Sequence, residues 1–234
     1  MKVLQETTSL WESLVDKNPT VFTPHLASSL GKLGNCLTKV KQFKESVDVT
    51  QECTSLYRTL IAKDSATYTP HLAFSLTNLG VCLSYVNQFT ESLNVTQECI
   101  FLFRSLITKD SATYTPCLAL NLRNLGIYLS RVNRFTESVD VTQECVSLYR
   151  SLIANDSATY THHLAHSLGT LGNSLSAMER YTEAEDVTQE SVSLLGIENG
   201  RQGGPKSDAS LVQGPWSGDG DPPRIVSGPI LPVW

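Results

Sequence analysis

The chain has 234 residues, of which 41% are hydrophobic and 18% are charged, as is typical of a folded protein with a substantial apolar core. Its net charge of −5 argues against a nucleic-acid-binding protein, because such proteins are usually basic. No stretch approaches the roughly 18 apolar residues of a membrane helix, and the first residues contain no apolar signal segment. The composition therefore predicts a cytoplasmic protein that binds neither nucleic acid nor a membrane.

The sequence repeats itself with a constant period. Four aromatic residues follow one another at intervals of 46 residues: Phe22, Tyr68, Tyr114 and Tyr160. Residues 3–22 align with the second half of a unit, so the chain opens on a half repeat. The predicted segments are a half repeat with a single helix at 1–22, repeats at 23–68, 69–114 and 115–160, a truncated repeat at 161–195, and a Gly/Pro-rich disordered tail at 196–234.

Each unit is predicted to contain two helices. In the second repeat the spacing of Leu72, Leu76, Leu79 and Leu83 places them on one helical face. We predict a first helix near 70–86, with Thr69 as its N-cap and Pro70 in its first position. Phe89 opens a second helix, expected near 90–108. The same division applies to the other units, and we call the two helices A and B.

One such hairpin cannot bury the apolar stripes of both its helices, whereas stacked hairpins can. The predicted fold is therefore all-α, a superhelical solenoid of antiparallel helix hairpins with a 46-residue period. The six cysteines fit this picture, because most of them recur with the repeat and none forms a CxxC pair. We expect them to be small buried residues at helix contacts rather than disulfide or metal ligands.

A motif, L-x-x-L-G-x-x-L, begins in successive units at Leu30, Leu76, Leu122 and Leu168. It resembles the first helix of the tetratricopeptide repeat (TPR). The resemblance implies that the motif's glycine marks a close crossing of helices A and B, at Gly34, Gly80, Gly126 and Gly172. Because the common TPR has about 34 residues, the longer unit resembles the kinesin-light-chain type and the C-terminal repeat arrays of fungal signalling NTPases.

For function, the resemblance implies protein or peptide binding in a concave groove on the helix A side. The candidate groove residues are positions beside the motif that differ between repeats: Lys32, Asn35, Lys39, Asn78, Tyr85, Arg123, Asn124 and Arg131. Helix A and its exit turn are mainly basic, whereas the front of helix B is acidic. This division favours an acidic or C-terminal peptide as ligand, or else reflects only solvated faces and helix-dipole preferences.

An enzyme is not predicted, because the sequence contains no G-x-x-x-x-G-K-[ST], G-x-S-x-G or H-E-x-x-H motif. No cofactor is expected. His162, His163 and His166 form an HHxxH cluster whose members can share a helix face. However, His163 is in register with His25 and His71, so we interpret the cluster as inherited from the repeat rather than as a metal site.

Two alternatives remain open at the level of sequence. Because the chain opens on a half repeat, it is also compatible with a detached or degenerate sensor region of a larger fungal STAND-type NTPase. Uncapped ends that stack between chains would instead produce self-association. The tail contains 8 of the 14 glycines and 6 of the 10 prolines, and either carries a short linear motif or is passive.

Overall fold

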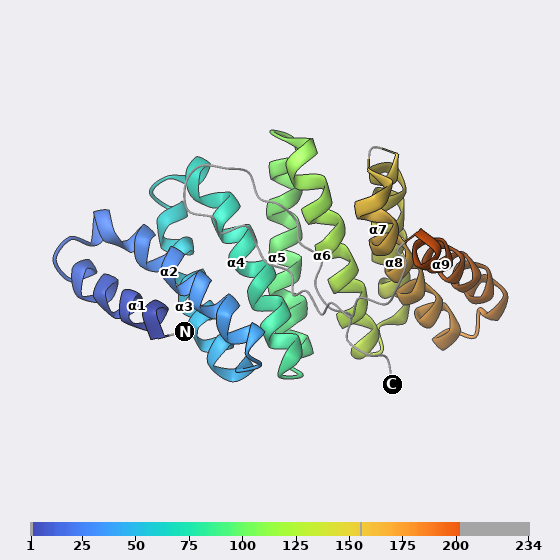
Figure 1. Ribbon diagram of the computed structural model, residues 1–234, viewed down its shortest axis with the longest axis horizontal. Helices are drawn as coiled ribbons and strands as arrows, with labels where there is room; N and C mark the ends of the chain where they lie inside the picture. Colours follow the sequence, from blue (N-terminus) through green and yellow to red (C-terminus); the bar gives the residue numbers. More distant parts are fainter. Residues whose placement is uncertain (1, 155, 202–234) are drawn as a thin grey trace. The chain divides into compact units, whose positions relative to one another are not determined.

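The computed structural model describes residues 2–154 and 156–201, in which helices account for almost all of the chain (Figure 1). Within these residues the elements are α1 (Lys2–Val15), α2 (Pro19–Lys39), α3 (Phe43–Ile61), α4 (Ser65–Tyr85), α5 (Phe89–Ile107), α6 (Ser111–Arg131), α7 (Phe135–Ile153), α8 (Ser157–Ala177) and α9 (Tyr181–Arg201). Helices α2, α4, α6 and α8 are the predicted helices A, and α3, α5, α7 and α9 are the helices B. The all-α repeat is confirmed, because α4, α6 and α8 begin 46 residues apart. The predicted tail beyond residue 201 lies outside the described residues.

The helices form two compact units, one of which extends to Phe103 within α5 while the other starts at Arg104. In the first unit α2 packs against α1 and α3, and α3 packs against α4. In the second unit α7 packs against α6 and α8, and α8 packs against α9. Helices A of neighbouring repeats also touch, α2 with α4 and α6 with α8.

Each unit contains a small apolar core that joins one hairpin to the next. In the first unit Val47 of α3 packs with Leu79, Cys82 and Leu83 of α4. In the second unit Val139 of α7 packs with Leu171 and Leu175 of α8 and with Ala184 of α9. The predicted stacking of hairpins is therefore present within each unit.

Helix A begins about five residues earlier than the sequence analysis placed it. Asp64, not Thr69, caps α4, because its side chain accepts a hydrogen bond of 3.1 Å from the backbone N–H of Thr67. Pro70 consequently lies inside the helix. An aspartate is a better N-cap than a threonine, and hydrogen bonds from Thr67 lower the pKa of the Asp64 carboxyl. Asp110 and Asp156 cap α6 and α8 in the same manner.

Helices A and B are joined by tight turns with one left-handed residue each. Asn87 and Asn133 adopt φ of 61° and 60°, a conformation that asparagine tolerates. Lys41 and Glu179 occupy the same place in the first and last repeats, with φ of 63° and 61°.

The last helix is longer than predicted. The repeat was expected to end at Leu195, whereas α9 continues to Arg201 and covers the full length of the helices B before it. Gly196 weakens a helix by about 1 kcal/mol relative to alanine but does not stop it. The first proline after it comes only at position 205.

Small polar side chains line the contact between helices A and B. Cys53, Cys99 and Cys145 each donate a thiol hydrogen bond to a helix A carbonyl, with sulfur–oxygen distances of 3.2, 3.1 and 3.1 Å. Ser191 does the same at 2.7 Å in the last repeat. Cysteine at this position is thus a small buried residue, as predicted, and also a hydrogen-bond donor. Burial raises the pKa of the Cys53 thiol to about 12, so it remains protonated.

Cys36 departs from the prediction, because it is partly exposed while the other five cysteines are buried. Its counterpart in the next repeat, Cys82, approaches the hydroxyl groups of Thr38 and Ser46 in the preceding hairpin. Within the described residues α1 alone precedes the helix of Cys36, so Cys36 has one preceding helix where Cys82 has a complete hairpin. The different exposure of Cys36 and Cys82 therefore follows from the place of their repeats in the array, since both residues are cysteines.

A ladder of ion pairs joins successive helices B. An arginine of one helix B pairs with a glutamate 40 residues later in the next, with nitrogen–oxygen distances of 2.6 to 2.8 Å: Arg58–Glu98, Arg104–Glu144 and Arg150–Glu190. The residue of α1 that corresponds to these arginines is Glu12. The residue of α3 that corresponds to the glutamates is Glu52. Burial and the negative charge of Glu12 raise the pKa of Glu52. The first step of the ladder is therefore repulsive.

We expect Glu12→Arg to complete the ladder and to stabilise the attachment of α1 to α3. Because the pair is exposed, the gain should be about 0.5–1 kcal/mol, and it should shrink at high salt. Hydrogen exchange of the α1 amides measures the effect. Glu12→Gln is the control, since it removes the repulsion without adding a cation. An arginine variant no better protected than the glutamine variant would contradict the expectation.

Candidate functional site

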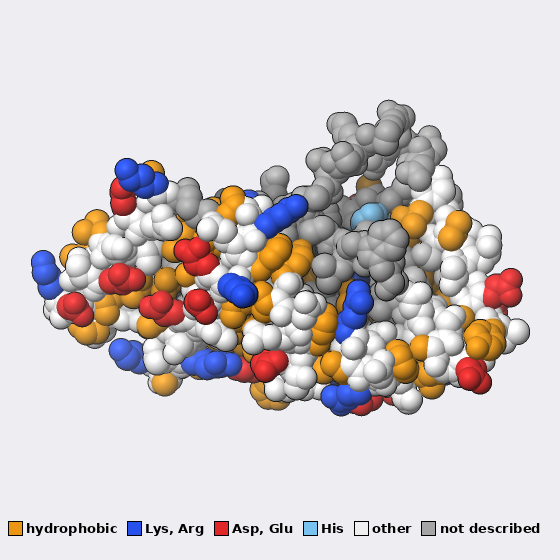
Figure 2. Space-filling model, turned by 90° about the horizontal axis from the view of Figure 1, so that it is seen from below, with side chains coloured by type: hydrophobic (Ala, Val, Ile, Leu, Met, Phe, Trp, Pro, Cys, Tyr) orange, Lys and Arg blue, Asp and Glu red, His pale blue; other side chains and the backbone are white. Residues whose placement is uncertain are grey.

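Helices A differ from helices B in charge. The sequences of α2, α4, α6 and α8 contain no aspartate or glutamate, and their cations are Lys32, Lys39, Arg123 and Arg131. Each helix B contains at least two acidic residues. Figure 2 shows one face of the molecule, on which acidic and basic side chains lie among hydrophobic ones. The division of charge predicted from the sequence therefore follows the helices of the structure.

Four of the candidate groove residues reach solvent. On α2, Lys39 is exposed, and Lys32 and Asn35 are partly exposed. On α6, Arg131 is exposed at the end of the helix. These side chains are in a position to contact a ligand directly.

Three other candidates are packed against neighbouring helices. Asn78 and Asn124 are only 7% and 8% exposed. Tyr85 is partly buried and stacks on Phe43 of α3, with ring centroids 4.4 Å apart and an interplanar angle of 14°. Burial raises the pKa of the Tyr85 hydroxyl. The positions beside the motif are therefore not uniformly solvent-facing.

Arg123 is also buried, with 8% of its surface exposed. Its Nη1 lies 3.1 Å from Nδ1 of His163 on α8. Since a guanidinium can only donate, His163 accepts this bond as a neutral imidazole. Burial and the charge of Arg123 lower the pKa of His163 to about 3, which is consistent with a neutral ring. Arg123 thus ties α6 to α8 in the second unit.

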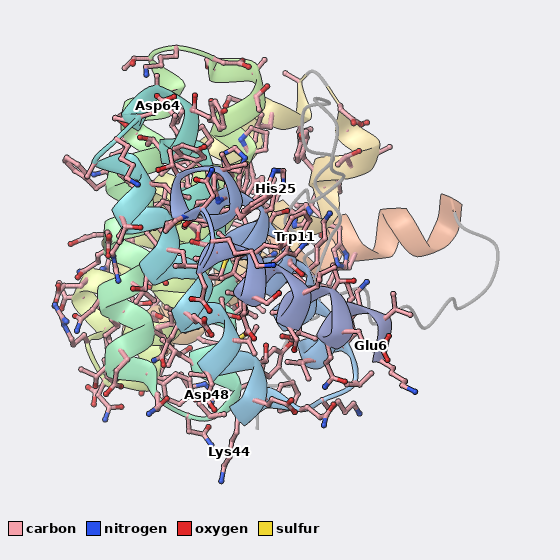
Figure 3. The ribbon with its side chains drawn as sticks, turned by 90° about the vertical axis from the view of Figure 1, so that its left-hand side faces the viewer. Glu6, Trp11, His25, Lys44, Asp48 and Asp64 are labelled. Atoms are coloured by element: carbon pink, nitrogen blue, oxygen red, sulfur yellow. The ribbon has the colours of Figure 1, made fainter. Side chains whose placement is uncertain are left out.

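His163 belongs to a contact that recurs along the chain, between an aromatic residue of helix B and a histidine of the next helix A. Trp11 stacks on His25 with centroids 4.9 Å apart, and Figure 3 shows the two side chains between α1 and α2. Tyr57 lies 5.5 Å from His71, and Tyr149 stacks on His163 at 5.4 Å. The repeat register of His163 is confirmed, and in its contact the histidine also pairs with an arginine.

The structure also brings together His162 and His166. Their Nε2 atoms are 3.0 Å apart, and both side chains are partly exposed. Burial, together with the proximity of His162 and Arg123, lowers the pKa of His166 to about 4. Among the residues that the structure describes, no group of three or more His, Cys, Asp or Glu side chains is arranged to hold a metal ion.

Solved structures with the same fold identify the architecture. Two structures of nearly identical TPR-like repeats of the kinesin light chain type from Podospora anserina, one a point variant, share 15% sequence identity with this chain. Their TM-scores are 0.58 and 0.57, and the alignments cover 85% and 86% of this chain and 89% and 90% of theirs. The fold is TPR-like. A structure of MamA gives a TM-score of 0.55 at 10% identity, with 82% of this chain and 89% of MamA covered.

The predicted resemblance to kinesin-light-chain TPR repeats is confirmed at the level of fold. No protein-family model matches the chain, and no curated protein matches it in sequence. TPR-like arrays are generally protein-interaction scaffolds and are typically not catalytic. None of the helices in the described part of the chain has the length and apolar character needed to cross a membrane.

Proposed function

We propose that the chain is a protein-interaction scaffold that binds an acidic peptide or helix in the groove on the helix A side. The observation that carries the proposal is the absence of any acidic residue from the helices A of each unit taken by itself. In the first unit α2 and α4 carry the exposed Lys39 and the partly exposed Lys32, and in the second unit α6 and α8 carry the exposed Arg131. Such a face attracts an anionic chain, because like charges that would repel it are missing.

Within the first unit, α2 supplies two of these cations to one helix face. Lys32 and Lys39 are seven residues apart, which is about two helical turns, or about 10 Å along the axis. A peptide in the polyproline II conformation spans that distance with about three residues, and residues three apart lie on the same side of it. Glutamates spaced by three residues would therefore meet both lysines. Arg123 has no part in this contact, because it is buried against His163.

The test is a binding titration with a Glu-rich peptide about ten residues long, which can span the helix A face. We expect the double variant Lys32→Ala/Lys39→Ala to weaken binding by about tenfold, and the affinity of the unchanged chain to fall as salt is raised. Lys44→Ala is the matched control, since Lys44 is an exposed lysine of the same unit on helix B (Figure 3). Equal affinity of the double variant and the control would overturn the proposal.

A further inference from the structure

The imidazoles of His162 and His166 converge at one point on α8. Their Nε2 atoms are 3.0 Å apart, their ring centroids 4.2 Å apart, and their ring planes lie at 82°. This pair occurs only in the last repeat. The register of His162 is occupied by Pro24, Pro70 and Pro116 in the other repeats, and that of His166 by Ser28, Phe74 and Leu120. His163 has histidine counterparts in other repeats, but His162 and His166 do not.

The distance between the two nitrogens suits a shared metal ion. With metal–nitrogen bonds of about 2.0–2.1 Å, a nitrogen–nitrogen distance of 3.0 Å corresponds to an angle at the metal of about 94°. A tetrahedral angle would require about 3.3–3.4 Å with the same bonds. The pair therefore fits adjacent positions of a tetragonal site, the geometry that Cu²⁺ and Ni²⁺ prefer with nitrogen and oxygen ligands. A single N–H···N hydrogen bond between the rings is the competing explanation.

We propose that His162 and His166 form a two-imidazole site for a divalent transition-metal ion, with Cu²⁺ bound more tightly than Ni²⁺ or Zn²⁺ and water completing its coordination. Both side chains are partly exposed, so an ion can reach them from solvent. The ranking of the three ions follows from the geometry and from the usual order of affinities.

Arg123 limits the affinity of this site. Its guanidinium acts electrostatically on His166, and a positive charge so close disfavours a bound cation. His163 is not a ligand, because its Nδ1 accepts the hydrogen bond from Arg123. Replacing Arg123 by glutamine should consequently tighten metal binding, an effect that an interaction elsewhere on the chain would not show.

The experiment is a calorimetric titration of the full chain with Cu²⁺, accompanied by electron paramagnetic resonance. Cys36→Ser serves as the background, since Cys36 is the only partly exposed thiol among the described residues. We expect one bound Cu²⁺ with nitrogen coupling from two imidazoles. His162→Pro should weaken binding by about a hundredfold, because a chelating pair becomes a single ligand.

His162→Pro is a structurally conservative change, because α2, α4 and α6 all carry proline in this register. His166→Ala is the second variant, and His71→Ala is the control, a partly exposed histidine in the first unit. Retained affinity in both His162→Pro and His166→Ala, or nitrogen coupling unchanged in either, would overturn the proposal. Loss of affinity in these two variants together with normal binding by His71→Ala would establish it.

Discussion

Lowering the pH from 7 to 5 should destabilise the second unit by several kcal/mol. The folded-state pKa values of His163 and His166 are about 3 and about 4, against an ordinary value of 6.5. Between these values the unfolded chain binds protons that the folded chain does not, so stability falls as pH drops below 6.5. At pH 5 each histidine costs about 2 kcal/mol, since one unit of difference corresponds to about 1.4 kcal/mol.

The physical cause lies in the groups around the two rings. His163 is 3% exposed and faces the guanidinium of Arg123 on α6 and the ring of Tyr149 on α7. A proton on His163 would therefore be buried beside an existing positive charge, and its Nδ1 could no longer accept from Arg123. His166 faces His162 on its own helix and lies near Arg123 as well.

The measurement is the free energy of unfolding in urea at pH 7 and pH 5, with hydrogen exchange of the α6 and α8 amides. The double variant His163→Gln/His166→Gln should lose far less stability between the two pH values than the unchanged chain. His71→Gln controls for the general effect of replacing a histidine on a helix A. The window lies above the ordinary pKa of aspartate and glutamate, so carboxylates contribute little to the difference. An equal loss in the double variant would contradict the assignment.

The sequence allowed the repeat, the helix types and the close crossings to be predicted because these features recur in every unit. The beginning of helix A was misplaced, since Pro70 was taken for its first residue. The better signal was Asp64, three residues before Thr67, because an aspartate accepts from the third backbone N–H of a helix. The last repeat supports this, because α8 begins in the same register with His162 in place of the proline.

The candidate site was harder to predict, because burial depends on contacts between repeats. Arg123 was selected since it differs from its counterparts, yet its side chain meets His163, which lies 40 residues later in the next repeat. Periodicity within one repeat contains no information on such a pair. The same interval of 40 residues separates the partners of the arginine–glutamate ladder. Searching the sequence for opposite charges at this interval would have revealed the ladder.

The second large effect concerns Gly126, where we expect substitution by alanine to cost about 1–3 kcal/mol of stability. A Cβ at this position would overlap the Oγ1 of Thr142 on α7, whereas its next neighbours, Thr142 Cβ and the Ser138 carbonyl oxygen, are at 3.6 and 3.7 Å. Thr142 is fully buried and its Oγ1 has no hydrogen-bond partner among the described atoms. One hydroxyl oxygen therefore accounts for the whole obstruction.

The double variant Gly126→Ala/Thr142→Ala should recover most of the loss, since it removes that oxygen. Urea unfolding of the four members of this cycle gives a coupling energy, which we expect to be about 1–3 kcal/mol. Additive effects of the two substitutions would contradict the steric explanation.

Gly169 of α8 provides the matched control within the same unit. A Cβ there would meet only Ser191 Oγ at 3.8 Å, an ordinary contact. Because alanine is the better helix former, Gly169→Ala should raise stability by about 0.5–1 kcal/mol. The same substitution on two helices A is thus expected to have opposite signs. This contrast separates a glycine that the crossing of helices A and B requires from one that the repeat merely contains.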